Sequence, residues 1–182
     1  MDILAHALWA GVGLGLARRH YALTRRTAVA TVVLAALPDV LHLLPLWGWW
    51  VFSDGSWAAL RAYAIAVPGQ EPPLPPMVQM FSHHLHCIMH SAVVAGAVTG
   101  LLWWARRAFW VPLLGWWSHI VIDLFTHSAE YYPVAVLYPV SDWAFDGLAW
   151  NTPWFMVANY FALGMAGVWL VASRKNKQAA WW

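Results

Sequence analysis

Charged residues are scarce in this chain of 182 residues, and their scarcity is the first constraint on its fold. Only 10% of the residues are charged, 62% are hydrophobic, and the mean hydropathy is +0.54. A soluble globule of this size needs far more polar surface to face water. The composition therefore argues against an ordinary soluble domain and predicts a protein for which the lipid bilayer is part of the solvent.

Cysteine is nearly absent, since Cys87 is the only one. A single thiol excludes an internal disulfide and any zinc site made of cysteines alone, so a metal bound here must be held by nitrogen and oxygen. The net charge is also small, at +2, and the basic residues fall in short clusters, which argues against nucleic acid as a partner. No Lys or Arg precedes the first apolar segment, so we expect no cleavable signal peptide.

Long apolar stretches are what the sequence has in quantity. Five of them have about the length needed to cross a bilayer, for which ~20 residues suffice. They lie at residues 2–17, 27–47, 82–105, 108–127 and 153–172. Tryptophans gather near their ends, as in interfacial aromatic belts. We therefore predict an all-α fold, in which the single domain 1–182 is a polytopic membrane bundle of about five transmembrane helices.

Basic clusters predict the orientation of these helices. They lie at residues 18–26, at Arg106 and Arg107, and in the tail at 173–182. The positive-inside rule places all three on the cytoplasmic side, so five crossings put the amino terminus outside and the carboxyl terminus inside. The segment 51–80 then becomes an extracytoplasmic insertion, in which 54–66 is expected to form a short interfacial helix. The loop 128–152 lies on the same side.

Histidine and aspartate residues interrupt the apolar helices in groups. Ionisable side chains inside membrane helices cost about 2.5–3.5 kcal/mol each on insertion scales, so they need partners and usually mark function. Members of one group are mostly three or four residues apart, which places them on one helix face. The candidate metal ligands are His6 in the first stretch, Asp39 and His42 in the second, His86 and His90 in the third, and His119, Asp123 and His127 in the fourth.

The predicted topology brings these groups to a common depth. Counting residues to the outer end of each helix, at 1.5 Å per residue, places most of them roughly 6 to 12 Å below the outer interface. Imidazole nitrogen together with carboxylate oxygen suits zinc, manganese or iron far better than calcium or magnesium. We therefore predict a divalent-metal site, with zinc the first choice, that opens to the extracytoplasmic side.

Several of these segments resemble a known family, the membrane-bound, metal-dependent hydrolases that include LexA-binding inner-membrane-associated proteins. The opening MDILAHALWA resembles the D-x-x-x-H segment of that family, LPDVLH its P-D element, and MHS at 89–91 its T-H-S element with Met in place of Thr. The strongest match is GWWSHIVIDLFTHSAEYYP, followed by LYPVSDWAFDGLAW. These look like the family's H-x-x-x-D-x-x-T-H helix and the loop after it, and the likeness covers most of the chain except 51–80.

The resemblance carries further implications for the site. The family is distantly similar to zinc-dependent phospholipase C and the P1-type nucleases, all-helical phosphodiesterases with zinc ions held by His and Asp. It implies that His119, Asp123 and His127 are ligands, with Asp39 and a histidine of the third stretch completing a site for two ions. This chain lacks the H-x-x-x-E element and the amino-terminal Trp ligand of those soluble enzymes, so a third ion is not expected. The implied location is the bacterial inner membrane.

These expectations describe a hydrolase that acts on a lipid or lipid-linked phosphoester at the outer leaflet, with membrane lipids as its partners. Bound metal ions would activate a water molecule and neutralise charge on the phosphoryl group. Asp2 and Glu130, which are carboxylates near the mouth of the site, are candidates for the base that orients the water. The alternatives are a membrane protein that transports or binds a metal ion or a proton, haem ligation by His90 and His119, and a structural protein with a polar plug.

Overall fold

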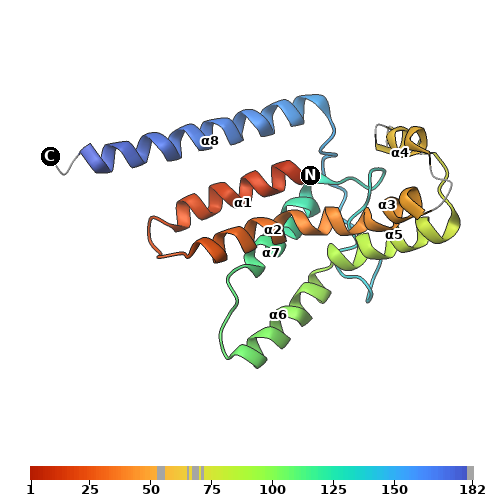
Figure 1. Cartoon of the computed structure of the whole chain (residues 1–182), viewed down its shortest axis with the longest axis horizontal. Coiled ribbons are helices and arrows are strands. Elements are labelled where there is room, and N and C mark those ends of the chain that lie inside the picture. The colour runs from red at the N-terminus through yellow and green to blue at the C-terminus, as the bar shows by residue number, and fades with distance from the viewer. Residues whose placement is uncertain (53–55, 65, 67–69, 71, 180–182) are drawn as a thin grey trace.

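The computed structural model describes residues 1–52, 56–64, 66, 70 and 72–179. These residues form eight α-helices and no β-strand, so the predicted all-α fold is confirmed (Figure 1). The helices are α1 (Ile3–Ala17), α2 (Arg25–His42), α3 (Leu44–Phe52), α4 (Trp57–Ala64), α5 (Pro76–Met89), α6 (Ala92–Arg106), α7 (Leu113–Thr126) and α8 (Pro153–Ala179). Each of the five apolar stretches is helical, and α4 lies within the predicted interfacial helix, of which 54, 55 and 65 fall outside the described residues.

Two of the predicted membrane helices are broken rather than straight. α2 and α3 meet at 53°, and α5 and α6 meet at 60°. α2 continues through Pro38 and ends before Pro45, which lies in the first turn of α3, where its missing amide hydrogen is not needed. His90 and Ser91 form the second break, and the Ser91 hydroxyl starts α6 by accepting a hydrogen bond of 3.1 Å from the amide of Val94.

Length and composition make α8 a candidate membrane span. Its segment Pro153–Ser173 has 21 residues and a mean hydropathy of 1.7, and it lies almost entirely on the outside of the protein. The two bent pairs qualify only if each pair is one span, and α1 and α7 are shorter apolar helices. Association with a membrane is therefore supported, whereas the predicted five-span bundle is not confirmed by the described helices.

α2 lies at the centre of the bundle, where it packs against α1, α5 and α7, while α8 packs on α1 (Figure 1). Its approach to α7 depends on Gly115, because a Cβ there would meet the carbonyl oxygen of Thr31 at 2.0 Å and the nitrogen of Ala35 at 3.0 Å. Small residues let helix backbones come this close. His119 and Asp39 each lie about one turn beyond this crossing point, so the close approach makes the two side chains face each other.

The loop after α7 folds back over the end of that helix. The amides of Gly147, Leu148 and Trp150 donate to its last carbonyls over 2.9–3.0 Å. A helix leaves these carbonyls without partners of its own, so the loop satisfies them. The contact requires a glycine, since a Cβ at Gly147 would lie 2.5 Å from the carbonyl oxygen of Phe125 and 2.7 Å from that of His127. The loop therefore holds His127 firmly at the end of α7.

We expect Gly115→Ala to destabilise the protein, although the same change in a helix usually stabilises it by up to ~1 kcal/mol. The added methyl group would have to push α7 away from α2, at a cost of about 1–3 kcal/mol. Gly100→Ala is the matched control, because Gly100 lies in α6 and a Cβ there meets nothing within 4 Å. Thermal unfolding followed by tryptophan fluorescence should give a lower midpoint for Gly115→Ala alone, and an equal or higher midpoint for it would contradict the packing argument.

Candidate metal centre

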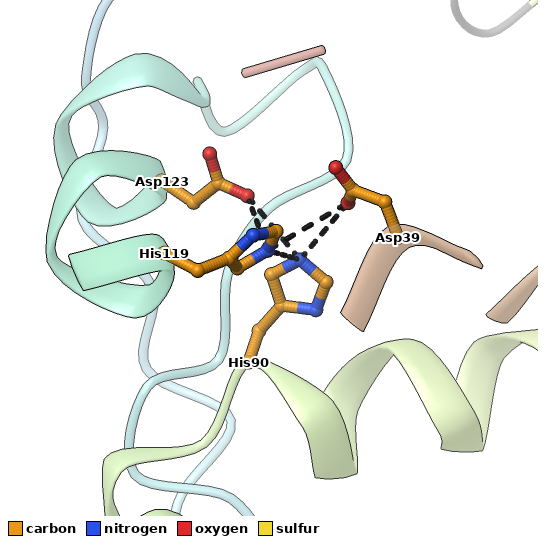
Figure 2. Close-up of side chains that lie close together, drawn as sticks. All are labelled: Asp39, His90, His119 and Asp123. Atoms are coloured by element: carbon orange, nitrogen blue, oxygen red, sulfur yellow. Dashed lines mark hydrogen bonds and ion pairs between the residues drawn. The ribbon is translucent and has the colours of Figure 1, made fainter. Parts of the chain in front are cut away.

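Four buried side chains from three parts of the fold meet at one point (Figure 2). Asp39 comes from α2, His90 from the break between α5 and α6, and His119 and Asp123 from successive turns of α7. One ligand atom from each lies within 4.8 Å of the other three. None of the four residues is more than 7% exposed. This buried Asp/His cluster could hold a metal ion.

Asp123 is the residue around which the cluster is arranged. Four imidazole Nε2 atoms surround its carboxylate, with His119 at 3.1 Å, His90 at 3.2 Å and His127 at 3.5 Å from Oδ2, and His6 at 2.9 Å from Oδ1. His119 and His127 are four residues before and four residues after Asp123 in the sequence. In the structure both approach the carboxylate of Asp123, as their spacing on one helix face predicts.

A second carboxylate and an amine complete the inner part of the cluster. Asp39 Oδ1 lies 3.5 Å from His90 Nε2 and 3.7 Å from His119 Nε2. The amino group of Met1 contacts Asp123 Oδ1 and lies 3.1 Å from His127 Nε2. Positive and potentially positive groups thus approach the carboxylates from several directions.

Backbone carbonyls fix which nitrogen of three histidines faces the cluster. The contacts are His119 Nδ1 to the oxygen of Ala35 at 2.7 Å, His90 Nδ1 to that of His86 at 2.8 Å, and His127 Nδ1 to that of Tyr132 at 2.8 Å. A carbonyl oxygen only accepts hydrogen bonds, so each Nδ1 carries the hydrogen. In the neutral ring the lone pair is then on Nε2, which points inward. This is the arrangement in which a second group orients a metal-binding histidine.

The inward lone pairs lie too close together to be stable without a cation. His90 Nε2 and His119 Nε2 are 2.9 Å apart, and the two carboxylates of Asp39 and Asp123 face the same space. Two neutral imidazoles cannot both direct lone pairs at one another over this distance without repulsion, which a proton or a metal ion between them relieves. Two imidazole nitrogens and two carboxylates are a donor set that fits a divalent metal ion, and His127 Nε2 lies 3.5 Å from one of these carboxylates.

His42 and His86 lie next to this centre rather than inside it. The His86 ring centroid is 4.1 Å from that of His90 and 5.6 Å from that of His42. Neither ring nitrogen of His86 has a hydrogen-bond partner, and the same holds for His42 Nδ1 and for Asp39 Oδ2. Buried polar atoms without hydrogen-bond partners are rare in native proteins, and a bound ion is one way in which such atoms are satisfied.

A cavity of about 700 Å³ opens over the cluster. Its lining includes the predicted ligands Asp39, His42, His86 and His127. The other wall is formed partly by α4, which contributes Trp57, Leu60, Arg61 and Tyr63. These four predicted ligands therefore face a cavity that is also lined by aromatic rings and by the cationic side chain of Arg61.

The two predicted catalytic carboxylates lie in different surroundings. Asp2 lines the cavity and caps α1, where its Oδ1 accepts hydrogen bonds from the amide of Ala5 at 3.0 Å and from the hydroxyl of Tyr160 at 2.8 Å. Glu130 is exposed in the turn after α7 and is not among the described residues that line the cavity. A catalytic role for either residue stays a prediction.

The carbonyls of Ala35, His86 and Tyr132 are functional groups that the side-chain pattern could not indicate. The best available signal was the pair of small residues at the helix crossing, Ala35 on α2 and Gly115 on α7, which permits the contact between Ala35 and His119. Tyr132 has no such signal, because its carbonyl reaches His127 through a turn of the loop.

No known protein family, curated protein or solved structure matches the chain. The resemblance to membrane-bound, metal-dependent hydrolases therefore stays a prediction from the quoted segments. The case for a metal centre depends on the geometry of the buried side chains.

We expect the purified protein to bind zinc or manganese at the cluster, and His119→Ala and Asp123→Ala to lose that metal because each removes a central ligand. His20→Ala is the control, since His20 is exposed in the turn after α1. Metal content per chain, measured by mass spectrometry after dialysis, should fall in the two cluster variants and match the wild type in the control. A wild-type protein without metal after reconstitution would contradict the metal centre.

Proposed function

We propose that the protein is a metal-dependent hydrolase of a lipid or lipid-linked phosphoester. The observation that carries the proposal is the convergence of imidazole Nε2 atoms on two buried carboxylates. His90 and His119 approach both Asp39 and Asp123, and His127 approaches Asp123. A bound divalent cation would there supply charge neutralisation and an activated water molecule. The chain itself excludes bulk water by burial and holds the ligands through backbone contacts, which is the preorganisation that hydrolysis requires.

The cavity over the cluster supports a phosphorylated substrate. Arg61 lines the cavity that also contains Asp39, His42 and His86. A guanidinium group pairs well with phosphate through two parallel hydrogen bonds. We propose that Arg61 binds the phosphate while Trp57 and Leu60 contact the less polar part of the substrate. Asp2 faces the same cavity and is the proposed base that orients the water.

We further propose two ions, as the family resemblance implies. The first would be held by the four residues of Figure 2, Asp39, His90, His119 and Asp123. The second would lie towards the cavity mouth. There Asp39 Oδ2, His42 Nδ1 and both ring nitrogens of His86 have no hydrogen-bond partner. Asp39 would then help to hold both ions. Zinc is the proposed metal, because nitrogen ligands predominate.

A transporter of metal ions or protons fits the surroundings of the cluster less well. A relay across a bilayer needs polar side chains that continue on the far side of the site. Below the cluster the neighbouring groove is instead lined mostly by apolar residues such as Ala10, Leu14 and Val121. Its polar residues Thr31 and Ser118 donate hydrogen bonds to backbone carbonyls. The hydrolase is for this reason our preferred function.

We expect phosphatidic acid in mixed micelles to be hydrolysed by the zinc-loaded protein and not after chelation. Asp123→Asn should reduce release of inorganic phosphate to background, because it removes the negative charge at the centre of the cluster and leaves the volume of the side chain almost unchanged. Asp142→Asn is the matched control, since Asp142 is exposed in the loop after α7 and should leave turnover unchanged. Metal-independent turnover, or efficient cleavage of soluble esters with no cleavage of any lipid, would contradict the proposal.

For the membrane topology we propose five spans in the bacterial inner membrane, with the amino terminus outside and the cluster near the outer interface. In a Cys87→Ser background, Val140→Cys in the loop after α7 should react with an impermeant maleimide in intact spheroplasts. Tyr21→Cys, after α1, should react only once the membrane is opened. Both side chains are well exposed, at 79% and 69%. The reverse labelling pattern would contradict the orientation.

A further inference from the structure

A second, larger hollow lies along α1, on the side where α7 and α8 face each other. α8 packs on α1, and no comparable contact joins the described parts of α7 and α8. The space that remains is a groove of about 1470 Å³. Its walls include Gly13 and Leu14 of α1, Leu114 and Phe125 of α7, and Phe155 and Ala158 of α8.

The walls of this groove present hydrocarbon rather than polar atoms. The hydroxyl groups of Ser118 and Thr31 are used within the protein, since Ser118 donates to the carbonyl of Gly115 at 2.7 Å and Thr31 to that of Thr27 at 2.9 Å. The ring nitrogen of Trp9 likewise donates to the side chain of Asn159 at 2.9 Å. An ion or a sugar would find few free partners here, whereas an alkyl chain loses no hydrogen bond.

One end of the groove lies beside the metal centre. Met1 lines both the groove and the cavity that contains the metal ligands, and Thr126, also a lining residue, donates to Asp123 Oδ1 at 3.3 Å. From there the groove extends along α7 as far as Leu114, and Leu114 to Phe125 spans about 16 Å at 1.5 Å per residue. That length matches one leaflet of a bilayer, which is about half of the ~30 Å hydrocarbon core.

We infer that the groove between α1, α7 and α8 holds one hydrocarbon chain of a lipid whose polar head group lies at the Asp/His cluster. The inference rests on the proposed function for the statement that this lipid is the substrate. Membrane lipid is as apolar as the groove, so the groove contributes position rather than affinity. A hydrocarbon chain fixed in the groove would hold the phosphoester bond of the lipid at the metal centre. Misplacement of the reacting bond by about 1 Å can lower the rate ~10²-fold.

Two glycines on α1 allow a matched test. Gly13 lines the groove, whereas Gly11 faces two other hollows, and a Cβ at either position meets nothing within 4 Å. Gly13→Trp should therefore block the groove, and Gly11→Trp should place the same side chain outside it. Ala158→Trp blocks the groove from the α8 wall and serves as a second blocking variant should Gly13→Trp fail to fold.

The probe is phosphatidic acid with a photoreactive diazirine in one acyl chain, incorporated with the full-length protein into phosphatidylcholine vesicles. With the diazirine near the ester, wild type should be labelled around Phe125 and Phe155. With the diazirine at the chain end, labelling should move to Leu114 and Leu23. Peptide mass spectrometry should show loss of the chain-end labelling in Gly13→Trp and no change in Gly11→Trp.

A second readout separates this inference from the proposed hydrolase. Gly13→Trp should lower kcat/KM for a long-chain phosphatidic acid about 100-fold and leave that for a water-soluble short-chain analogue unchanged. Labelling that is ordered by depth and blocked by Gly13→Trp, in a protein that cleaves neither compound, would contradict the hydrolase and still support the groove. The same labelled positions for both probes, or equal labelling of wild type and Gly13→Trp, would show that the probe reacts only from the surrounding bilayer. Either result would overturn the inference.

Discussion

Asp39 and Asp123 place two carboxylates inside an apolar helical protein, and the rest of the structure is arranged around them. A buried ion loses several kcal/mol of hydration free energy, which only close partners can offset. Four imidazole rings and the amino group of Met1 approach Asp123, and three of those rings also approach Asp39. Three of the rings are oriented by backbone carbonyls so that their lone pairs point inward, and an inward set of lone pairs and carboxylates favours a bound cation.

The irregular parts of the backbone lie where this cluster needs them. The break between α5 and α6 ends one helix at His90, whose ring can then turn into the centre while Ser91 begins the next helix. The loop after α7 supplies amides to the last carbonyls of that helix and the carbonyl of Tyr132 to His127. Broken helices are tolerated at membrane depth where they line a cavity, so the breaks are consistent with a site inside a membrane protein.

The surroundings of the cluster are divided into a more polar side and an apolar side. The cavity next to α4 is lined by Arg61 and by His42 and His86, whose rings have nitrogen atoms without a hydrogen-bond partner. The groove beside α8 is lined mostly by hydrocarbon. Met1 lines both hollows and its amino group contacts Asp123, so each hollow lies beside the cluster. An amphiphile has this same division into a polar and an apolar part, which is the reason that we propose a lipid phosphoester rather than a soluble ester or a transported ion.

The sequence by itself determined the helical class, the five apolar stretches and the grouping of His and Asp on helix faces, because hydropathy and residue spacing are local properties. Only the tertiary structure decided that the second stretch bends by 53° and the third by 60°, because the angle between two helical segments depends on what each segment packs against. It also decided that His119 Nε2 lies 3.7 Å from Asp39 Oδ1, because the distance between α2 and α7 depends on the contact of Gly115 with Thr31. No local pattern in the sequence predicts the groove, because it is the space that remains where α8 packs on α1 and not on α7.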